Sequence, residues 1–210
     1  MFSITCVGSC RPLLIALCFC IGAPAYALSS ETAKTSQVEL CPLGADHGLY
    51  TSADCQFYLG TKAYRHQRFA LAAAHWQEVL DLPLESAAEL RAKAQSTLGF
   101  LYFYGKGLKQ DKTRAIRLWQ AAAQQGAAEA FLHLGHAYQQ DDFFARDPVT
   151  ALAWYLAMQR KYPVPQTLET DHQLMWAQAQ QHARTLAERL SPQQRQQANQ
   201  QVDSLLAPTP

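Results

Sequence analysis

A pattern of aliphatic, small and aromatic residues repeats along the middle of this 210-residue chain. Its clearest copy consists of Leu98, Gly99, Tyr102, Ala115 and Trp119. The same pattern recurs 36 residues later as Leu134, Gly135, Tyr138, Ala151 and Tyr155. A shorter copy upstream keeps Leu59, Gly60, Ala72 and Trp76. Repetition at this period is typical of a solenoid, in which each helix pair buries its apolar face only by stacking on its neighbours. We therefore expect an all-α fold, an α-solenoid of stacked antiparallel helix pairs with C-terminal capping helices.

The clearest copy also contains the residues of a glycine-rich loop and of a second helix. These are Gly105, Gly107, Leu108, Asp111, Ala122, Ala123 and Gly126. With them, residues 98–126 resemble the Sel-one-like repeat (SLR), a longer-looped relative of the tetratricopeptide repeat. The next copy has Asp141 and Phe143 where the loop glycines of that family lie, and the upstream copy is shorter, like a plain tetratricopeptide hairpin. The resemblance implies three hairpins, at about residues 52–84, 86–126 and 127–162.

Residues 1–27 have the features of a secretory signal peptide. Arg11 precedes an apolar run over residues 12–22, and Ala25 and Ala27 supply the small residues of a cleavage site, so we expect cleavage after Ala27 and a periplasmic or secreted protein. A retained N-terminal anchor is the main alternative. A lipoprotein site fits less well, because large residues precede Cys18 and Cys20.

Two cysteines, Cys41 and Cys55, remain after the signal. In an exported chain they favour one disulfide, which would close a loop of about 15 residues and stabilise the fold by roughly 3 kcal/mol. Two free thiols are the alternative. A redox pair is not expected, because the spacing is not C-x-x-C.

Helix-boundary signals divide the rest of the chain. Residues 28–51 lack a clear period and predict a loosely ordered lead segment, with the first helix beginning near Ser52. Asp54 lies in the first turn of that helix, the second helix should end before Pro83, and Ser86 should open the third. Asp111 and Asp147-Pro148 mark further helix starts, Gly126 marks a helix end, and Ser191-Pro192 starts the last helix. Residues 163–210 predict C-terminal capping helices, including a long one at about 168–190.

Charge and motifs exclude several functions. Without Arg11 the chain has 17 basic and 17 acidic side chains, so we expect no nucleic-acid binding. No Gly-x-Ser-x-Gly, His-Glu-x-x-His, Ser-x-x-Lys or phosphate-loop motif is present, so we expect a non-enzymatic protein without catalytic residues, cofactor or metal. A zinc site formed by Glu129, His133 and His136 is conceivable, since these residues lie within two turns of one predicted helix, but ordinary structural histidines explain the same residues.

The resemblance also implies a binding face. In tetratricopeptide-type hairpins the first helix of each pair lines the concave side, which would place there Thr61, Tyr64, Arg65, Phe100, Phe103, Tyr104, His136, Gln139 and Gln140. Aromatic side chains on such a face suit a protein or peptide partner. The alternative is that Phe100 and Phe103 pack inside the protein, as we expect of Tyr102, Trp119 and Trp154.

The leading hypothesis is therefore a periplasmic scaffold that binds a peptide or an envelope protein in its concave face. The alternatives are a structural subunit of a motor or secretion ring and, with less support, a weak β-lactamase or penicillin-binding enzyme like some exported relatives in this repeat family. The sequence predicts neither the partner nor the oligomeric state.

Overall fold

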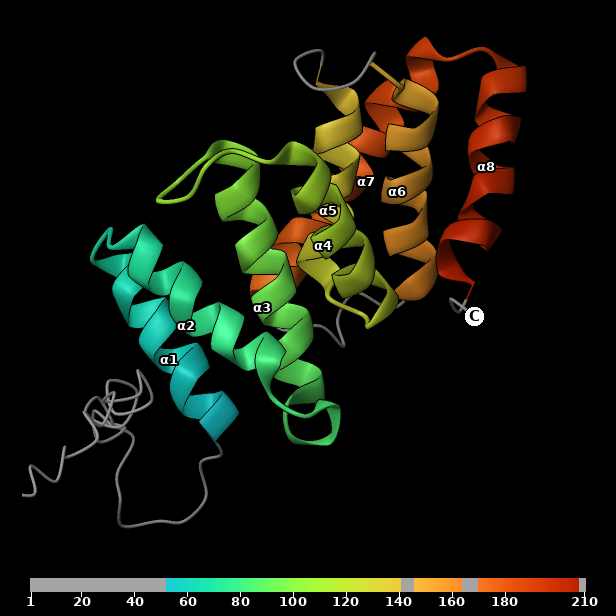
Figure 1. Cartoon of the computed structure of the whole chain (residues 1–210). Helices are drawn as coiled ribbons and strands as arrows, with labels where there is room; N and C mark the ends of the chain where they lie inside the picture. The colour runs from blue at the N-terminus through green and yellow to red at the C-terminus, as the bar shows by residue number, and fades with distance from the viewer. Residues whose placement is uncertain (1–51, 141–145, 164–169, 208–210) are drawn as a thin grey trace, which may run out of the picture. The chain divides into compact units, whose positions relative to one another are not determined.

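The computed structural model describes residues 52–140, 146–163 and 170–207, all within the unit formed by residues 40–210. These residues form helices only (Figure 1). The helices are α1 (Ser52–Arg65), α2 (Phe69–Asp81), α3 (Leu84–Tyr104), α4 (Lys112–Gln124), α5 (Ala128–Gln139), α6 (Pro148–Lys161), α7 (Thr170–Arg189) and α8 (Pro192–Leu206). Helices α1 to α6 pack as three consecutive pairs, each against the next, which is the predicted α-solenoid. Among the described helices none is both long enough and apolar enough to cross a membrane.

The glycine of each Leu-Gly pair sets the distance between the two helices of a hairpin. A Cβ atom would lie 2.5 Å from Trp76 Nε1 at Gly60, 2.5 Å from Trp119 Nε1 at Gly99 and 2.2 Å from a ring carbon of Tyr155 at Gly135. The aromatic ring of the second helix thus lies directly against the backbone of the first, where only a hydrogen fits. The repeated pairing of glycine with an aromatic residue therefore determines how closely the two helices of a pair pack.

Matching caps begin the second helices of the middle and third pairs. The carboxylate of Asp111 accepts a hydrogen bond from Arg114 N at 2.8 Å, and that of Asp147 accepts one from Thr150 N at 2.9 Å. The backbone N–H of each aspartate donates to an equivalent carbonyl of the preceding helix, Tyr102 O at 3.0 Å and Tyr138 O at 3.1 Å. Both predicted caps are confirmed, and each also ties the two helices of its pair together.

The loop between α3 and α4 needs its glycines. Gly105 and Gly107 have φ of +65° and +70°, as expected of a tight turn, and Gly126 has φ of +87° after α4. At Gly107 a Cβ atom would lie 2.4 Å from Ala70 N, so this loop also packs closely against the start of α2. One expectation was wrong: α3 begins at Leu84 rather than Ser86, and its backbone leaves helical values at Ala87. Asp141 and Phe143 lie outside the described residues.

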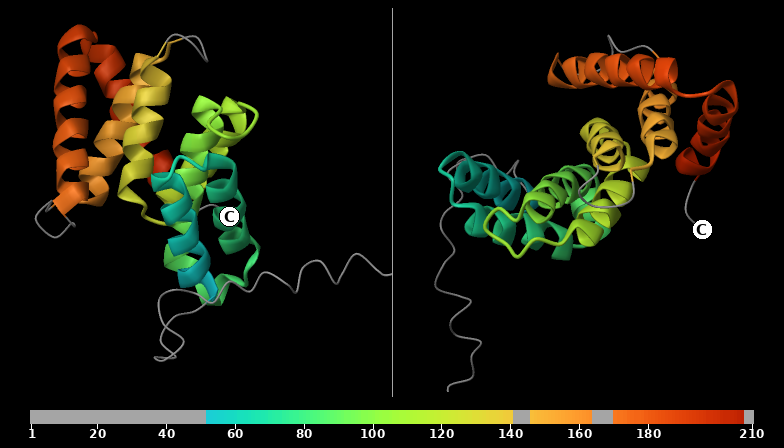
Figure 2. Two further views of the ribbon diagram at one scale, coloured as in Figure 1. Left: turned by 90° about the vertical axis from the view of Figure 1, so that its left-hand side faces the viewer. Right: turned by 90° about the horizontal axis from the view of Figure 1, so that it is seen from above.

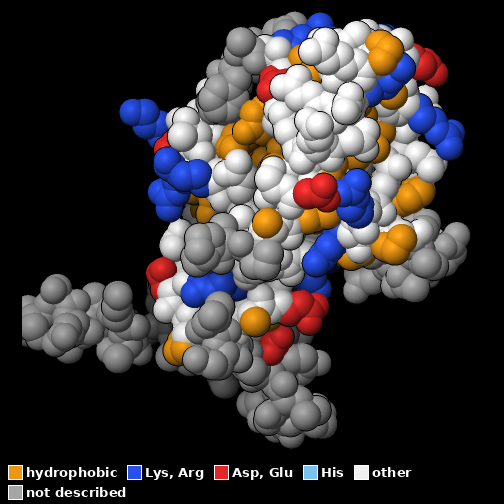
Figure 3. Space-filling model, turned by 90° about the vertical axis from the view of Figure 1, so that its right-hand side faces the viewer, with side chains coloured by type: hydrophobic (Ala, Val, Ile, Leu, Met, Phe, Trp, Pro, Cys, Tyr) orange, Lys and Arg blue, Asp and Glu red, His pale blue; other side chains and the backbone are white. Residues whose placement is uncertain are grey.

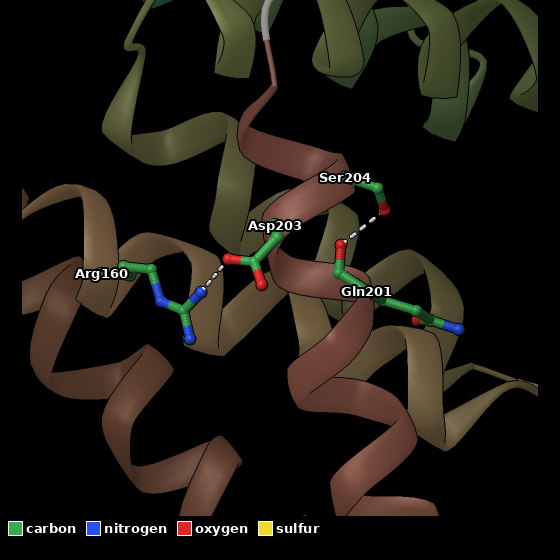
Figure 4. A network of polar contacts seen from close by, with 4 residues as sticks. All are labelled: Arg160, Gln201, Asp203 and Ser204. Atoms are coloured by element: carbon green, nitrogen blue, oxygen red, sulfur yellow. Dashed lines mark hydrogen bonds and ion pairs between the residues drawn. The ribbon is translucent and has the colours of Figure 1, made fainter.

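Helices α7 and α8 cover the last hairpin. Figure 2 shows α7 crossing beside α5 and α6, and α8 packing along α6. Arg160 of α6 forms an ion pair with Asp203 of α8, while Ser204 donates to Gln201 O at 2.7 Å within α8 (Figure 4). The last helix starts at Ser191-Pro192 as predicted, and the structure adds a capping box there, in which the Ser191 hydroxyl accepts from Gln194 N at 3.2 Å. The solenoid thus ends on two helices whose exposed residues are mostly polar.

The apolar core has two parts. One contains buried residues of α1, α2 and α3, and the other extends from α3 through α8. Phe100 and Tyr102 of α3 pack against both, so α3 joins the two parts. Figure 3 shows the face over the C-terminal helices, where polar and charged side chains interrupt the hydrophobic ones.

Candidate functional site

Three aromatic side chains of the predicted binding face form one cluster on α1 and α3. The ring centres of Tyr64 and Phe100 are 6.4 Å apart, and those of Phe100 and Tyr104 are 4.8 Å apart. Tyr104 is 49% exposed, whereas Tyr64 and Phe100 are half-buried. The ammonium group of Lys106 lies 5.0 Å from the centre of the Phe100 ring, within the range of a cation–π interaction. The cluster therefore offers partly open aromatic surface with a positive charge beside it.

The assignment of Phe103 to this face is wrong. Its side chain is only 2% exposed, and its ring centre lies 5.2 Å from that of Trp119 on α4. The helical register explains this, because residue 103 is one turn after Gly99 and so lies on the side of α3 that packs against α4. The structure therefore agrees with the alternative stated in the sequence analysis, in which the Phe103 ring packs inside the protein.

The polar residues predicted on α1 lie near the cluster. The Thr61 hydroxyl donates to Phe57 O at 2.9 Å, which satisfies it within its own helix. Arg65 is exposed at the end of α1, one residue after Tyr64. Arg65 is therefore an exposed charged residue of the predicted set and follows Tyr64 directly in the chain.

The residues predicted on α5 contact the rest of the chain. His136 Nε2 lies 3.1 Å from His182 Nε2 on α7, and Gln139 Oε1 accepts a hydrogen bond from the Tyr155 hydroxyl at 3.0 Å. Gln140, which follows α5, is exposed. Helix α7 packs on α5 here, so the part of the predicted face on α5 is partly occupied by the chain itself. The candidate site is accordingly the surface formed by Tyr64, Arg65, Phe100, Tyr104 and Lys106, which we call the aromatic site.

Burial changes the acid–base chemistry of two α5 histidines. Burial lowers the pKa of His133 to about 4, with a smaller contribution from His136, and lowers the pKa of His136 to about 4, with a smaller contribution from His182. The His133 ring stacks on Trp119 with centres 4.9 Å apart. Both imidazoles are therefore neutral at pH 7.

The conceivable zinc site does not form around Glu129, His133 and His136. His133 faces Trp119 and Phe100, and His136 faces His182. Glu129 instead lines a pocket of about 290 Å³ with Lys93, Tyr162 and His172, and burial raises its pKa, opposed by Ser96, His172 and Lys93. In the part of the chain that the structure describes, no three or more His, Cys, Asp or Glu side chains gather as metal ligands.

His182, which contacts His136, was not identified from the sequence, although the sequence contains a signal for its orientation. The buried residues of α7 are Ala179, Ala183 and Leu186, which mark its packed side. His182 lies three residues after Ala179 and so faces the same side. The pattern thus predicts that this histidine points inward, but it does not predict the helix that it meets.

Comparison with known proteins agrees with this architecture. The Sel1 repeat model matches residues 92–126 and 128–157. Among solved structures, the chain is similar to c5321, a protective antigen present in uropathogenic Escherichia coli strains and displaying an SLR fold, with 25% sequence identity and a TM-score of 0.56. The match covers 73% of this chain and 30% of c5321, so the chain spans less than a third of that protein's length. No curated protein matches.

The two matched segments coincide with the second and third hairpins, in which the Gly–aromatic contacts and the aspartate caps repeat 36 residues apart. The chain therefore carries Sel1 repeats and is a helical repeat protein with an SLR-type fold.

Proposed function

We propose that this protein is an exported scaffold that binds a polypeptide segment of a partner at the aromatic site. The observation that carries the proposal is the partly open Tyr64–Phe100–Tyr104 cluster on the first helices of two neighbouring pairs. Aromatic rings bury a large area at a small cost in side-chain entropy, which explains their frequency in interface hot spots.

The charges beside the cluster favour a partner with an apolar anchor and nearby acidic groups. Arg65 is exposed, and Lys106 lies over the rings of Phe100 and Phe69, at 5.0 and 5.5 Å from their centres. A carboxylate of the partner would approach these cations while an apolar side chain packs on Tyr104. Sel1 repeats mediate protein–protein interactions, which supports this role for the face.

Export and a Cys41–Cys55 disulfide are part of the same proposal. They rest on the signal-peptide features of residues 1–27 and on the two cysteines that follow. N-terminal sequencing of the protein from a periplasmic extract tests export, with Leu28 expected as the first residue. Thiol alkylation without reductant, followed by intact-mass measurement, tests the disulfide, with no label expected on either cysteine.

Site-specific cross-linking in intact cells tests the binding function. A photo-activatable phenylalanine replaces Tyr104 in one variant and Leu174 in the control, because Leu174 is 62% exposed but lies on α7, away from the aromatic site. We expect a discrete adduct from position 104, absent from position 174, that is lost when Arg65→Glu is added. Equal adducts from both positions, or none from position 104 in folded protein, would reject the aromatic site.

A further inference from the structure

Two histidine side chains meet between α5 and α7 with their ring nitrogens close together. His136 Nε2 and His182 Nε2 are 3.1 Å apart, and the ring planes are inclined by 80°. The ring centres are 4.7 Å apart, against 3.1 Å for the nitrogens. In a straight N–H···N hydrogen bond each ring centre lies behind its nitrogen on the line of the bond, which separates the centres further. At least one of the two ring axes is therefore inclined to the line that joins the nitrogens, an arrangement that two ligands of one ion also adopt.

The distance also fits a shared ion. Two imidazole nitrogens at about 2.0–2.1 Å from one ion, at the angles of tetrahedral or octahedral coordination, lie about 2.9–3.4 Å apart. The observed 3.1 Å falls in this interval without any movement of α5 or α7.

The surroundings hold both rings in place. The Tyr155 side chain, which is fully buried, stacks on the His182 ring with centres 5.3 Å apart and meets the His136 ring edge-on at 6.0 Å. Its hydroxyl is fixed by donation to Gln139 Oε1. Support of this kind orients ligands before a metal arrives and lowers the entropic cost of binding.

We propose that His136 and His182 bind one late first-row divalent metal ion, most tightly Cu²⁺. Imidazole suits Cu²⁺, Ni²⁺ and Zn²⁺, and affinity for a given nitrogen site peaks at Cu²⁺ in the Irving–Williams order. Water completes the coordination, because the nearest other histidine of α5, His133, faces Trp119. The bound ion fastens α7 to α5 across 46 residues of sequence and so strengthens the cap of the solenoid.

The ring of Tyr155 contacts both histidines, and its hydroxyl donates to Gln139; both of these side chains are uncharged at pH 7. Among the described residues no carboxylate joins the two histidines as a third ligand, which favours nitrogen-preferring ions over Mg²⁺ or Ca²⁺.

Calorimetric titration of the untagged mature protein, after removal of metals with EDTA, tests the site with CuCl₂, NiCl₂, ZnCl₂ and MgCl₂. We expect one equivalent of Cu²⁺ to bind more tightly than Ni²⁺ or Zn²⁺, and no saturable binding of Mg²⁺. His136→Gln and His182→Gln should each weaken Ni²⁺ binding at least tenfold. His66→Gln is the matched control, since His66 is an exposed histidine after α1, and should change binding less than twofold.

The proposal would be overturned if the protein did not bind Ni²⁺, or if His182→Gln bound Ni²⁺ with unchanged affinity. If the substitutions disturb folding, amide hydrogen exchange of the unsubstituted protein tests the site instead. Added Ni²⁺ should slow exchange in α7 severalfold relative to α2, and equal rates with and without Ni²⁺ would reject the site. These outcomes do not depend on the partner-binding function, because α7 lies away from the aromatic site.

Discussion

Substitution of Gly99 by alanine tests the inference that a glycine–aromatic contact sets the spacing of each helix pair. A Cβ atom at this position would lie 2.5 Å from Trp119 Nε1 and 2.7 Å from Cδ1. The indole cannot swing aside easily, because Nε1 donates to Ser96 O at 2.9 Å and the ring lies between Phe103 and His133. The added methyl group must therefore push the two helices apart or displace the indole.

Opposing effects determine the size of the loss. Alanine gains about 1 kcal/mol over glycine in a helix interior. Overpacking a tight core costs about 1–3 kcal/mol, and loss of the buried indole hydrogen bond adds about 1–3 kcal/mol. We expect Gly99→Ala to lower the free energy of unfolding by about 2 kcal/mol, which corresponds to a fall in Tm of about 4–8 °C for a protein of this size.

Gly60→Ala is the matched comparison. Its Cβ atom would approach the Trp76 ring equally closely, at 2.5 Å from Nε1. Trp76 Nε1, however, has no hydrogen-bond partner among the residues that the structure describes. Gly60→Ala should therefore cost about 1 kcal/mol less than Gly99→Ala, since no indole hydrogen bond is lost. Urea and thermal unfolding followed by circular dichroism measure both variants. If Gly99→Ala is as stable as the unsubstituted protein, the close-contact reasoning is refuted.

Two further predictions concern stability. In EDTA, His133 should destabilise the fold as the pH falls from about 6.5 to about 4, because this imidazole binds its proton at the ordinary pKa of 6.5 in the unfolded chain but only at about 4 in the folded chain. The loss in the free energy of unfolding should approach about 2–3 kcal/mol. Urea titrations over this pH range should lose this component in His133→Phe. Asp147→Ala should lower the free energy of unfolding by about 1 kcal/mol, because the hydrogen bond from Thr150 N is lost. Asp147→Asn keeps a capping oxygen and should cost only a few tenths of this loss. Equal losses in the two variants would argue against capping as the cause.

The elements of the repeat could be predicted from the sequence because each depends on local chemistry. An aspartate directly before a helix can cap it through a local hydrogen bond that does not depend on tertiary contacts, and Asp111 and Asp147 both form such caps. Gly105 and Gly107 likewise adopt the positive φ that their spacing predicts. The error at Ser86 has a local cause too, since α3 starts directly after Pro83 and absorbs an irregular residue at Ala87.

The direction of individual side chains was harder to predict. Two aromatic residues three apart, Phe100 and Phe103, were both assigned to the binding face, but Phe103 is buried beneath it and only Phe100 keeps partly exposed surface there. Position 103 follows Gly99 by four residues, and that spacing could have placed it toward α4. The contact between His136 and His182 depends on where a later helix crosses an earlier one, and the repeat pattern contains no information about that crossing.

The position of α7 determines which part of the first-helix surface a partner can use. Helices α1, α3 and α5 supply equivalent positions to that surface, but α7 packs on α5 and engages His136. Tyr64, Phe100 and Tyr104 on α1 and α3 contact one another as well as neighbouring rings of α2 and α5, and they stay partly exposed. A partner that needs three consecutive repeats would have to displace α7, whereas one that binds two would not. Under the proposed function, a tighter histidine contact would therefore restrict partner binding to the first two hairpins.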